Sequence, residues 1–145
     1  MLPRPQRISP PWPPGSLLKR AREERRAHKP VKTHDTDAAY LALVRDLPCL
    51  RCGVEPAGCA AHVRMSSAAL AKTQGLARKP HDRWTVPLCW GCHTHDPDSQ
   101  HRVGEQEFWA RVGLNPLLVC VALHDVAGDV VAMRAVALGA IGSRS

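Results

Sequence analysis

The sequence Pro48-Cys49-Leu50-Arg51-Cys52-Gly53 contains two cysteines separated by two residues, and Pro87-Leu88-Cys89-Trp90-Gly91-Cys92-His93 repeats that spacing. A two-residue spacing lets one tight turn direct both thiolates at a single metal ion, and two such turns can complete a tetrahedral zinc site. The sequence therefore predicts a structural zinc ion bound by Cys49, Cys52, Cys89 and Cys92. Such a site can stabilise a small fold by on the order of 10 kcal/mol.

The chain has 145 residues, with a single Phe and a single Tyr. This composition suits one small domain whose limited core needs additional stabilisation, such as a bound metal ion. Its six cysteines could instead form three disulfides in a secreted protein. However, the segment Met1–Arg7 leads into no apolar run of the kind found in signal peptides, so we favour metal binding in a reducing compartment. The remaining Cys59 and Cys120 are expected to be small buried hydrophobic residues.

The most apolar region, residues 114–141, is interrupted by His124, Asp125, Asp129 and Arg134, so no membrane-spanning helix is expected. We therefore expect a cytoplasmic protein that has no membrane partner.

Positive charge is concentrated at the N-terminus of this chain, whose net charge is +7. Residues 1–32 contain nine Lys or Arg and two Glu, whereas residues 33–145 contain eleven of each sign. Residues 1–34 are thus predicted to be a Pro-rich, basic and largely disordered arm that binds DNA. The alternative is a solvated tail that aids solubility. The arm's candidate phosphate contacts are Lys19, Arg20, Arg22, Arg25 and Arg26.

Hydrophobic periodicity predicts several short helices. Thr36 is expected to cap a helix that ends at Asp46 and buries Tyr40, Leu41, Val44 and Leu47. A second helix is expected over residues 100–112 with Gly113 closing it, and Asn115-Pro116 is expected to start a third that runs to His124. The segment 126–141 is apolar without a decisive period, so it fits either a strand pair around Gly128 or another helix.

Alternating residues predict two short strands, over 60–64 and 84–88. His62 lies on the first strand, and His93 is expected at or just inside the start of a helix. Trp90, within the second cysteine turn, is expected to pack against the metal site. The predicted fold class is α+β: a zinc-stapled domain over residues 35–113, then a helical or mixed extension over residues 114–145.

This order of motifs resembles the HNH endonuclease superfamily, which has a ββα-metal (treble-clef-like) core. The closer resemblance is to a phage-type branch that contains recombination-enhancement nucleases. It is carried by Pro48–Gly53 and Ala60-Ala61-His62-Val63-Arg64, by Lys79–Cys89, and by Gln100-His101-x-x-Gly104-Glu105-x-x-Phe108-Trp109. The resemblance implies hydrolysis of DNA phosphodiester bonds, with low sequence specificity, assisted by Mg²⁺ or another divalent cation.

The resemblance also implies roles for particular residues. His62 is the candidate general base and His93 a candidate ligand of the catalytic cation; a structural role for His62 and a spare zinc ligand at His93 are the alternatives. Asp82 is expected either to ligate that cation or to orient His62, and His101 is a candidate second ligand. Arg64, Lys72, Arg78, Lys79 and Arg83 are candidate contacts to DNA phosphates.

One position departs from the superfamily's pattern. Many members place Asp or His directly before the base, where this chain has Ala61. Either Asp82 and His101 complete the shell of the cation, or His62 is itself a ligand, or the cation is held weakly. A non-catalytic, zinc-containing DNA-binding module is therefore the alternative function.

Overall fold

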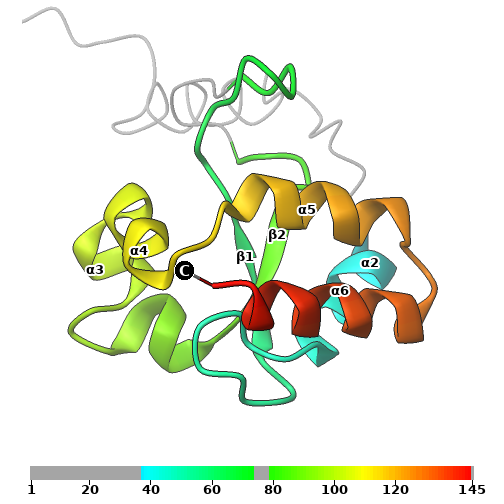
Figure 1. Ribbon diagram of the computed structural model, residues 1–145, viewed down its shortest axis with the longest axis horizontal. Coiled ribbons are helices and arrows are strands. Elements are labelled where there is room, and N and C mark those ends of the chain that lie inside the picture. The colour runs from blue at the N-terminus through cyan, green and yellow to red at the C-terminus, as the bar shows by residue number, and fades with distance from the viewer. Residues whose placement is uncertain (1–36, 74–78, 145) are drawn as a thin grey trace, which may run out of the picture. The chain divides into compact units, whose positions relative to one another are not determined.

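The computed structural model describes residues 37–73 and 79–144, and a two-stranded antiparallel sheet runs through their centre (Figure 1). The strands are β1 (Gly58–His62) and β2 (Thr85–Cys89). Around them lie α2 (Ala38–Asp46), the π-helical turn η1 (Gly91–His95), α3 (Gln100–Val103), α4 (Glu105–Val112), α5 (Pro116–Asp125) and α6 (Val130–Gly142). This arrangement confirms the predicted α+β class.

The sheet connects the two cysteine turns. β1 pairs with β2 so that Cys59 lies opposite Leu88 and Ala61 opposite Val86. Ala61, Val86 and Leu88 are fully buried, and β1 begins and ends two residues earlier than the alternation predicted. Because β2 ends at Cys89, the strand itself delivers the second pair of cysteines to the site.

Helix α2 buries the predicted apolar residues Tyr40, Leu41 and Val44. Its N-cap is Asp37, whose side chain accepts a hydrogen bond from the backbone N–H of Tyr40, so the prediction of Thr36 as the cap is wrong. A carboxylate one residue closer to the helix performs the capping that the Thr36 hydroxyl was expected to perform.

The helix predicted over residues 100–112 is divided in two at Gly104. The backbone of Gly104 has a φ of +93°, a conformation that ends α3 and lets α4 start in a new direction. Only glycine adopts this conformation without strain. Hydrophobic periodicity predicted an ordinary helical position at Gly104, but the chain changes direction there. Gly113, also at positive φ, closes α4 as predicted.

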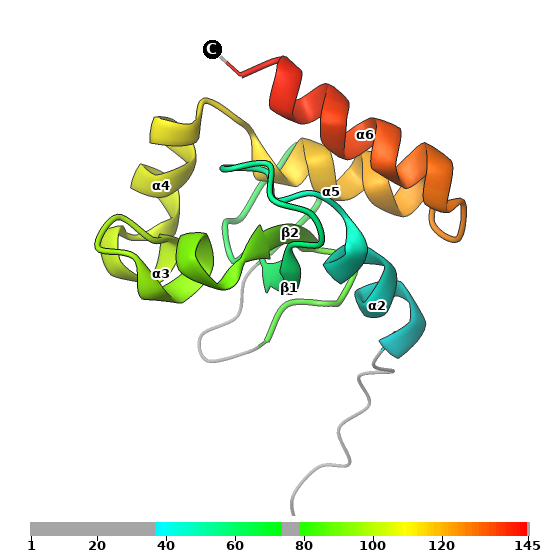
Figure 2. The ribbon, with the colours of Figure 1, turned by 90° about the horizontal axis from the view of Figure 1, so that it is seen from below.

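The C-terminal segment is helical throughout. Asn115 caps α5 through its side chain as predicted, and residues 130–142 form α6 rather than a strand pair. Figure 2 shows α5 and α6 side by side as an antiparallel pair. Cys120 and Leu123 of α5 and Met133 of α6 belong to the same core as the sheet, so the segment 114–144 completes that core. None of the helices among the described residues is long and apolar enough to cross a membrane.

Candidate metal centre and histidine pocket

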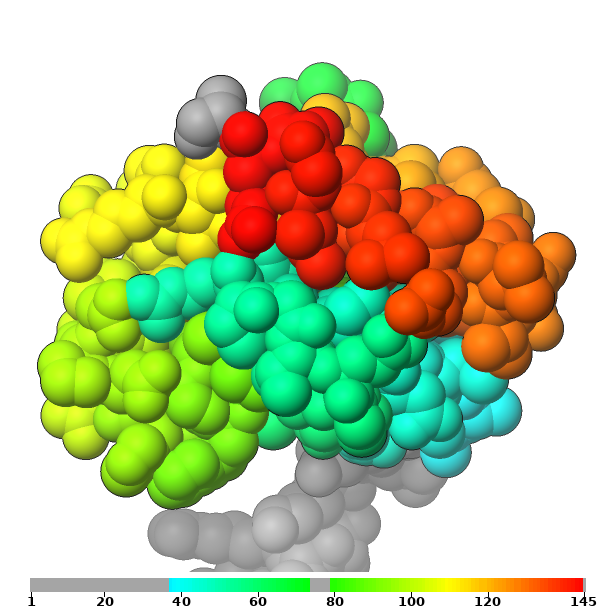
Figure 3. Space-filling model, turned by 60° about the horizontal axis from the view of Figure 1, so that its bottom comes forward, coloured from blue at the N-terminus to red at the C-terminus, as the bar shows by residue number. Residues whose placement is uncertain are grey.

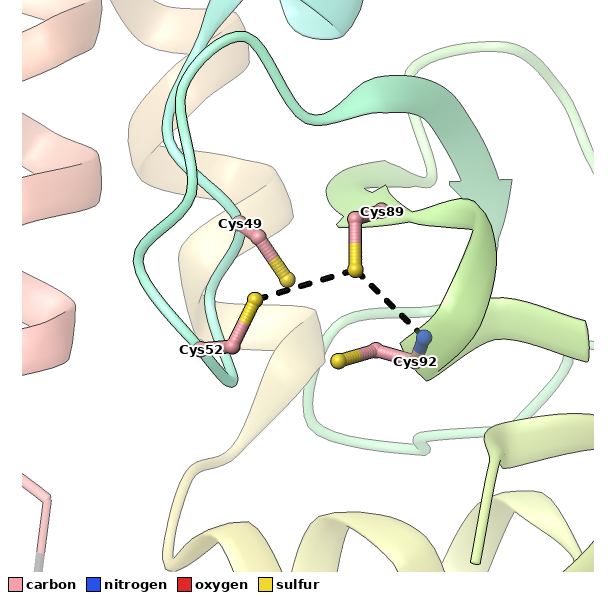
Figure 4. A group of neighbouring side chains, drawn as sticks. All are labelled: Cys49, Cys52, Cys89 and Cys92. Carbon is pink, nitrogen blue, oxygen red and sulfur yellow. Dashed lines mark hydrogen bonds between the residues drawn. The ribbon is translucent and has the colours of Figure 1, made fainter. Parts of the chain in front are cut away.

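The four predicted zinc ligands come together at one end of the sheet. Ligand atoms of Cys49, Cys52, Cys89 and Cys92 all lie within 4.8 Å of one another (Figure 4). The sulfurs of Cys52 and Cys89 are 3.7 Å apart. Two thiolates at the usual Zn–S distance of about 2.3 Å in a tetrahedron are separated by about 3.8 Å. The cluster therefore has the spacing of a tetrahedral thiolate site that can hold a metal such as zinc.

The chemistry of the four sulfurs favours a bound cation over free thiols. All four cysteines are free, so none of them is in a disulfide. Burial opposes ionisation of Cys49, but hydrogen bonds from the backbone of Cys52, Cys89 and Arg51 lower its pKa. Burial and the neighbouring thiols raise the pKa of Cys92. Four adjacent thiolates repel one another, and a divalent cation is the group that would relieve this repulsion.

The two remaining cysteines are not part of the cluster. Cys120 is fully buried in α5, with its thiol 3.5 Å from the carbonyl oxygen of Thr85, as expected of a small core residue. Cys59 on β1 is only half-buried, so that prediction is confirmed for Cys120 and not for Cys59. Cys59 lies on the same side of β1 as the buried Ala61, two residues nearer the start of the strand, where the burial is less complete.

A pocket of about 530 Å³ lies beside the end of β1 and is lined by five of the predicted site residues, three of which are histidines. His62 enters it from β1, His93 from η1 and His101 from α3. Its other lining residues are Ala60, Arg64, Lys79, Pro80, Gln100, Gly104 and Glu105. Residues from positions 60 to 105 of the chain thus meet around one cavity.

His62 is held by Asp82. The Nε2 atom of His62 lies 2.9 Å from Oδ1 of Asp82, and Oδ2 of Asp82 accepts a hydrogen bond from the backbone N–H of Asp37. Burial lowers the pKa of His62, while the hydrogen bond to Asp82 acts in the opposite direction. Because its partner is a carboxylate, Nε2 is the nitrogen that donates a proton to Asp82, and this leaves Nδ1 as the acceptor nitrogen of the neutral imidazole.

Asp82 is placed to orient His62. Its carboxylate is buried, and both oxygens are engaged, with Lys79 Nζ also 3.4 Å from Oδ1. It is not among the residues that line the pocket. These contacts favour the orienting role that the sequence left open, and cation binding by Asp82 stays a prediction.

His93 and His101 face each other across the pocket. Their Nε2 atoms are 3.0 Å apart. Burial, together with the neighbouring His101 and His62, lowers the pKa of His93, which favours the neutral imidazole that a metal ligand requires. Two imidazole nitrogens each about 2.1 Å from one ion and about 90° apart are separated by about 3.0 Å. The pair is spaced as two ligands of one ion would be.

No family model, curated protein or solved structure matches this chain.

The predicted phosphate contacts have different environments. Arg64 and Lys79 are exposed and line the pocket, whereas Arg83 stacks 4.9 Å from the Trp84 ring. Lys72 is buried, with its ammonium donating to the carbonyl of Met65 and lying over Trp84, so it is not presented to a phosphate. The remaining candidates, Lys19, Arg20, Arg22, Arg25, Arg26 and Arg78, lie outside the described residues.

Two polar residues that line the pocket, Glu105 and Gln100, had no predicted role. Glu105, the first residue of α4, accepts hydrogen bonds from the backbone N–H of Arg64 at 2.8 and 3.0 Å. It also accepts one from the side chain of Gln100, which is buried. Glu105 therefore ties the start of α4 to the chain two residues after His62. Gln100 belongs to the Gln-His motif and Glu105 to the Gly-Glu motif. The spacing of these motifs along the chain does not reveal that Glu105 contacts Arg64.

The prediction for Trp90 is wrong. Its ring is 60% exposed and stacks on His95, with centroids 4.4 Å apart and planes 17° apart. Trp90 precedes η1, where positions five apart come to the same side of the turn, so its ring meets His95 rather than the thiolates.

Proposed function

We propose that this chain is a metal-dependent DNA endonuclease of the HNH type, with structural zinc at the four cysteines and low sequence specificity. One observation carries the proposal: a histidine oriented by a buried carboxylate shares a pocket with two imidazoles spaced for one cation. This is the combination of base and ligands that hydrolysis of a phosphodiester requires.

His62 is the proposed general base. Its Nδ1 would take a proton from a water molecule whose oxygen bonds to the scissile phosphorus as the bond from phosphorus to the leaving sugar oxygen breaks. Asp82 would fix the ring and stabilise the imidazolium, which can return the proton to the leaving oxygen or to solvent. Burial lowers the pKa of His62, which favours the unprotonated form that a base requires. Proton transfer by a positioned side chain typically contributes about 10²- to 10⁴-fold in rate.

His93 and His101 are the proposed protein ligands of the catalytic cation, which would be Mg²⁺ or a similar ion. When bound, such an ion supplies positive charge that stabilises the oxygens of the phosphate during hydrolysis. Arg64 and Lys79 lie at the same pocket and would hold the adjacent DNA backbone without reading its sequence.

Ala61 does not weigh against this assignment. Ala61 is fully buried in the core, whereas His62 lines the pocket, because successive residues of a strand point to opposite sides. A ligand at position 61 of this strand would point into the core. The residue just before the base is therefore not where this chain needs its cation ligand.

The alternative is a non-catalytic, zinc-containing DNA-binding module. Among the described residues, the four cysteines are the group in which three or more potential ligand atoms lie within 4.8 Å, and the histidine pair brings only two. A cation held by two protein ligands depends on water and substrate to complete its shell. This observation favours weak cation binding. In the limiting case no cation is held, and the chain binds DNA without hydrolysing it.

The test is nicking of supercoiled plasmid by the zinc-loaded full chain in Mg²⁺, Mn²⁺ or EDTA. His62→Ala removes the proposed base, and His124→Ala is the matched control, because His124 lies on α5 and stacks edge-on against Tyr40 rather than lining the pocket. Zinc content and thermal unfolding are measured for every variant.

We expect metal-dependent nicking that EDTA abolishes, that His62→Ala lowers at least about 100-fold, and that His124→Ala leaves within about twofold. Salt-sensitive DNA binding without cleavage in any cation would overturn the enzyme and support the binding module. Equal losses in both histidine variants, with normal folding, would overturn the role of His62.

A further inference from the structure

A second cavity, of about 260 Å³, lies where α4 meets the first cysteine turn and the residues that follow α6. We call it the arginine cavity, and its lining residues are Arg51, Asp98, Phe108, Arg111, Val112 and Arg144. Figure 3 shows the segments that carry them meeting on one face, with α4 in yellow, the cysteine turn in teal and the C-terminal end in red. Three positive charges less one negative charge leave +2 at this lining, although residues 33–145 carry equal numbers of basic and acidic side chains. The cavity is therefore a local concentration of positive charge.

The guanidinium of Arg51 forms one wall of the arginine cavity. Its Nη2 donates to the carboxylate of Asp98, and the group lies over the Phe108 ring, 5.7 Å from the ring centroid. Its Nη1 lies 3.9 Å from Sγ of Cys92, so its other edge faces the thiolate cluster. The hydrogen bond from Arg51 and, to a smaller extent, the charge of Arg111 lower the pKa of Asp98. An oxyanion of the chain itself is thus already stabilised at this wall.

The other two guanidinium groups are held by bonds that leave some of their donors unused. Nε and Nη1 of Arg144 donate to backbone carbonyls at the end of α6 and in the first cysteine turn. Nε of Arg111 donates to Glu107, which does not line the cavity, at 2.8 Å. A guanidinium has five N–H donors. Within the part of the chain that the structure describes, Nη2 of Arg144 and both Nη atoms of Arg111 have no hydrogen-bond partner. Both groups are therefore oriented and still have N–H groups to offer a ligand.

We propose that the arginine cavity binds a phosphate group, and that this phosphate belongs to the DNA backbone next to the histidine pocket. A planar guanidinium pairs with a phosphate through two parallel N–H···O bonds, which a lysine cannot form. Because these side chains are already held by their own chain, binding orders little that was free before. The DNA source rests on the proposed function, whereas the phosphate site itself does not.

Helix α4 connects the arginine cavity to the histidine pocket. Gly104 and Glu105 line the pocket at the start of α4, and Arg111 and Val112 line the cavity at its end. Residues seven positions apart lie on the same side of a helix, so the two sites border one side of α4. Six helical residues rise by about 9 Å, and a DNA strand advances by about 3.4 Å per nucleotide. A strand whose scissile phosphate lies in the pocket therefore reaches the cavity within about three nucleotides.

The first measurement is titration of the zinc-loaded full chain with inorganic phosphate, followed through the arginine Nε–H signals in ¹H–¹⁵N spectra. Sodium chloride of equal ionic strength is the reference for screening. Arg111→Gln removes one guanidinium from the cavity and breaks only an exposed ion pair. Arg45→Gln is the matched control, because Arg45 is an exposed arginine on α2 that lines neither site.

We expect phosphate, but not chloride, to shift the signals of Arg51, Arg111 and Arg144 with a dissociation constant on the order of 10 mM. Arg111→Gln should weaken this binding at least about fivefold, and Arg45→Gln should leave it within about twofold. Signals that phosphate does not shift, or binding that both variants weaken equally, would overturn the site.

The second measurement is binding of a duplex oligonucleotide without added Mg²⁺ or Mn²⁺, at several salt concentrations. We expect Arg111→Gln to lower the affinity at least about fivefold and the salt slope of log K by about one, and Arg45→Gln to change neither. Phosphate binding together with unchanged DNA affinity in Arg111→Gln would overturn the DNA backbone as the source and would assign the cavity to a small phosphate compound. Because this binding is measured apart from hydrolysis, a chain that shows both expected losses but never cuts DNA would overturn the proposed enzyme and not this site.

Discussion

The imidazole of His62 and the carboxylate of Asp82 form a 2.9 Å contact that joins β1 to the loop before β2. The same carboxylate accepts from the backbone of Asp37 at the start of α2. One buried acid therefore fixes both the proposed base and the first helix of the described residues.

This contact predicts a particular pH dependence. Burial lowers the pKa of His62, so we expect the nicking rate of the wild type to rise with pH at values below histidine's usual pKa of about 6.5. Asp82 opposes that shift, so in Asp82→Asn the rise should move to still lower pH. The plateau rate should fall at least about tenfold, because the ring is held less firmly. Single-turnover nicking across pH measures both effects, with the exposed Asp125→Asn as control.

The stability of the fold should depend on pH in the same direction. Although burial opposes it, the hydrogen bond to His62 lowers the pKa of Asp82, and the pKa of His62 is lowered as well. Groups whose pKa values are depressed by folding stabilise the native state at higher pH, and that contribution is lost as the pH falls through the folded-state values. Between pH 7 and pH 4 the group that titrates is His62, so we expect the midpoint of thermal unfolding to fall over this range and to fall more steeply in Asp82→Asn, where the pKa of His62 is lower still. The contribution of Asp82 itself is lost only at pH values below the usual range of a carboxyl group. A less steep fall in Asp82→Asn would contradict the assignment.

The thiolate cluster should carry much of the stability. Cys92→Ser removes a buried ligand and is expected to cost several kcal/mol or to abolish folding, because zinc affinity is folding free energy in such sites. Cys59→Ser is the matched control: Cys59 lies on β1 outside the cluster, and its replacement should retain zinc and most of the stability. Zinc content and thermal unfolding measure both. Equal zinc loss in the two variants would argue against the four-cysteine site.

Glu105 should support the pocket at a distance from the chemistry. Glu105→Ala breaks two hydrogen bonds to the backbone N–H of Arg64, and we expect a loss of about 1–3 kcal/mol in the free energy of unfolding. Glu107→Ala, in the same helical turn, breaks an exposed pair with Arg111 and should cost at most about 0.5 kcal/mol. Urea denaturation compares the two, and similar losses would show that the tie to Arg64 contributes little.

Substitutions of Lys79 and Lys72 should affect different properties: Lys79 should contribute to DNA binding and Lys72 to the stability of the fold. Lys79 is 58% exposed at the pocket, so Lys79→Ala should weaken DNA binding and reduce the salt dependence of log K by about one unit of slope. Lys72 is buried against Trp84, so Lys72→Ala should instead lower the thermal midpoint. Binding isotherms at several salt concentrations and thermal unfolding decide between these results. A larger loss of binding in a well-folded Lys72→Ala would contradict this division.

Local patterns predicted the parts of this fold that depend on neighbouring residues. The cysteine spacing, the stripe of Tyr40, Leu41 and Val44, and the Asn115 cap are each set within a few positions of the chain, and the structure contains all of them. The division at Gly104 was missed because a glycine within a helical period is compatible with continuation, and only the packing of α4 requires a corner there.

The candidate site required contacts between distant positions. The sequence placed His62, His93 and His101 as site residues, and the pocket brings them together. It left the role of Asp82 open because a carboxylate next to a histidine motif can serve as ligand or as orienting partner, and only the fold decides which. The burial of Lys72 and the tie from Glu105 to Arg64 depend on how the loop and α4 pack, which composition and spacing do not specify.

The decisive measurement is the binding of Mn²⁺ to the zinc-loaded full chain, followed by the electron paramagnetic resonance signal of free Mn²⁺. His101→Ala removes one of the two facing imidazoles, and His95→Ala is the matched control, because His95 stacks on Trp90 and does not line the pocket. We expect the wild type and His95→Ala to bind a single Mn²⁺ per chain in addition to zinc, and His101→Ala to bind it at least about tenfold more weakly. Wild-type protein that binds no Mn²⁺, or Mn²⁺ binding that His101→Ala leaves unchanged, would contradict a catalytic cation at His93 and His101.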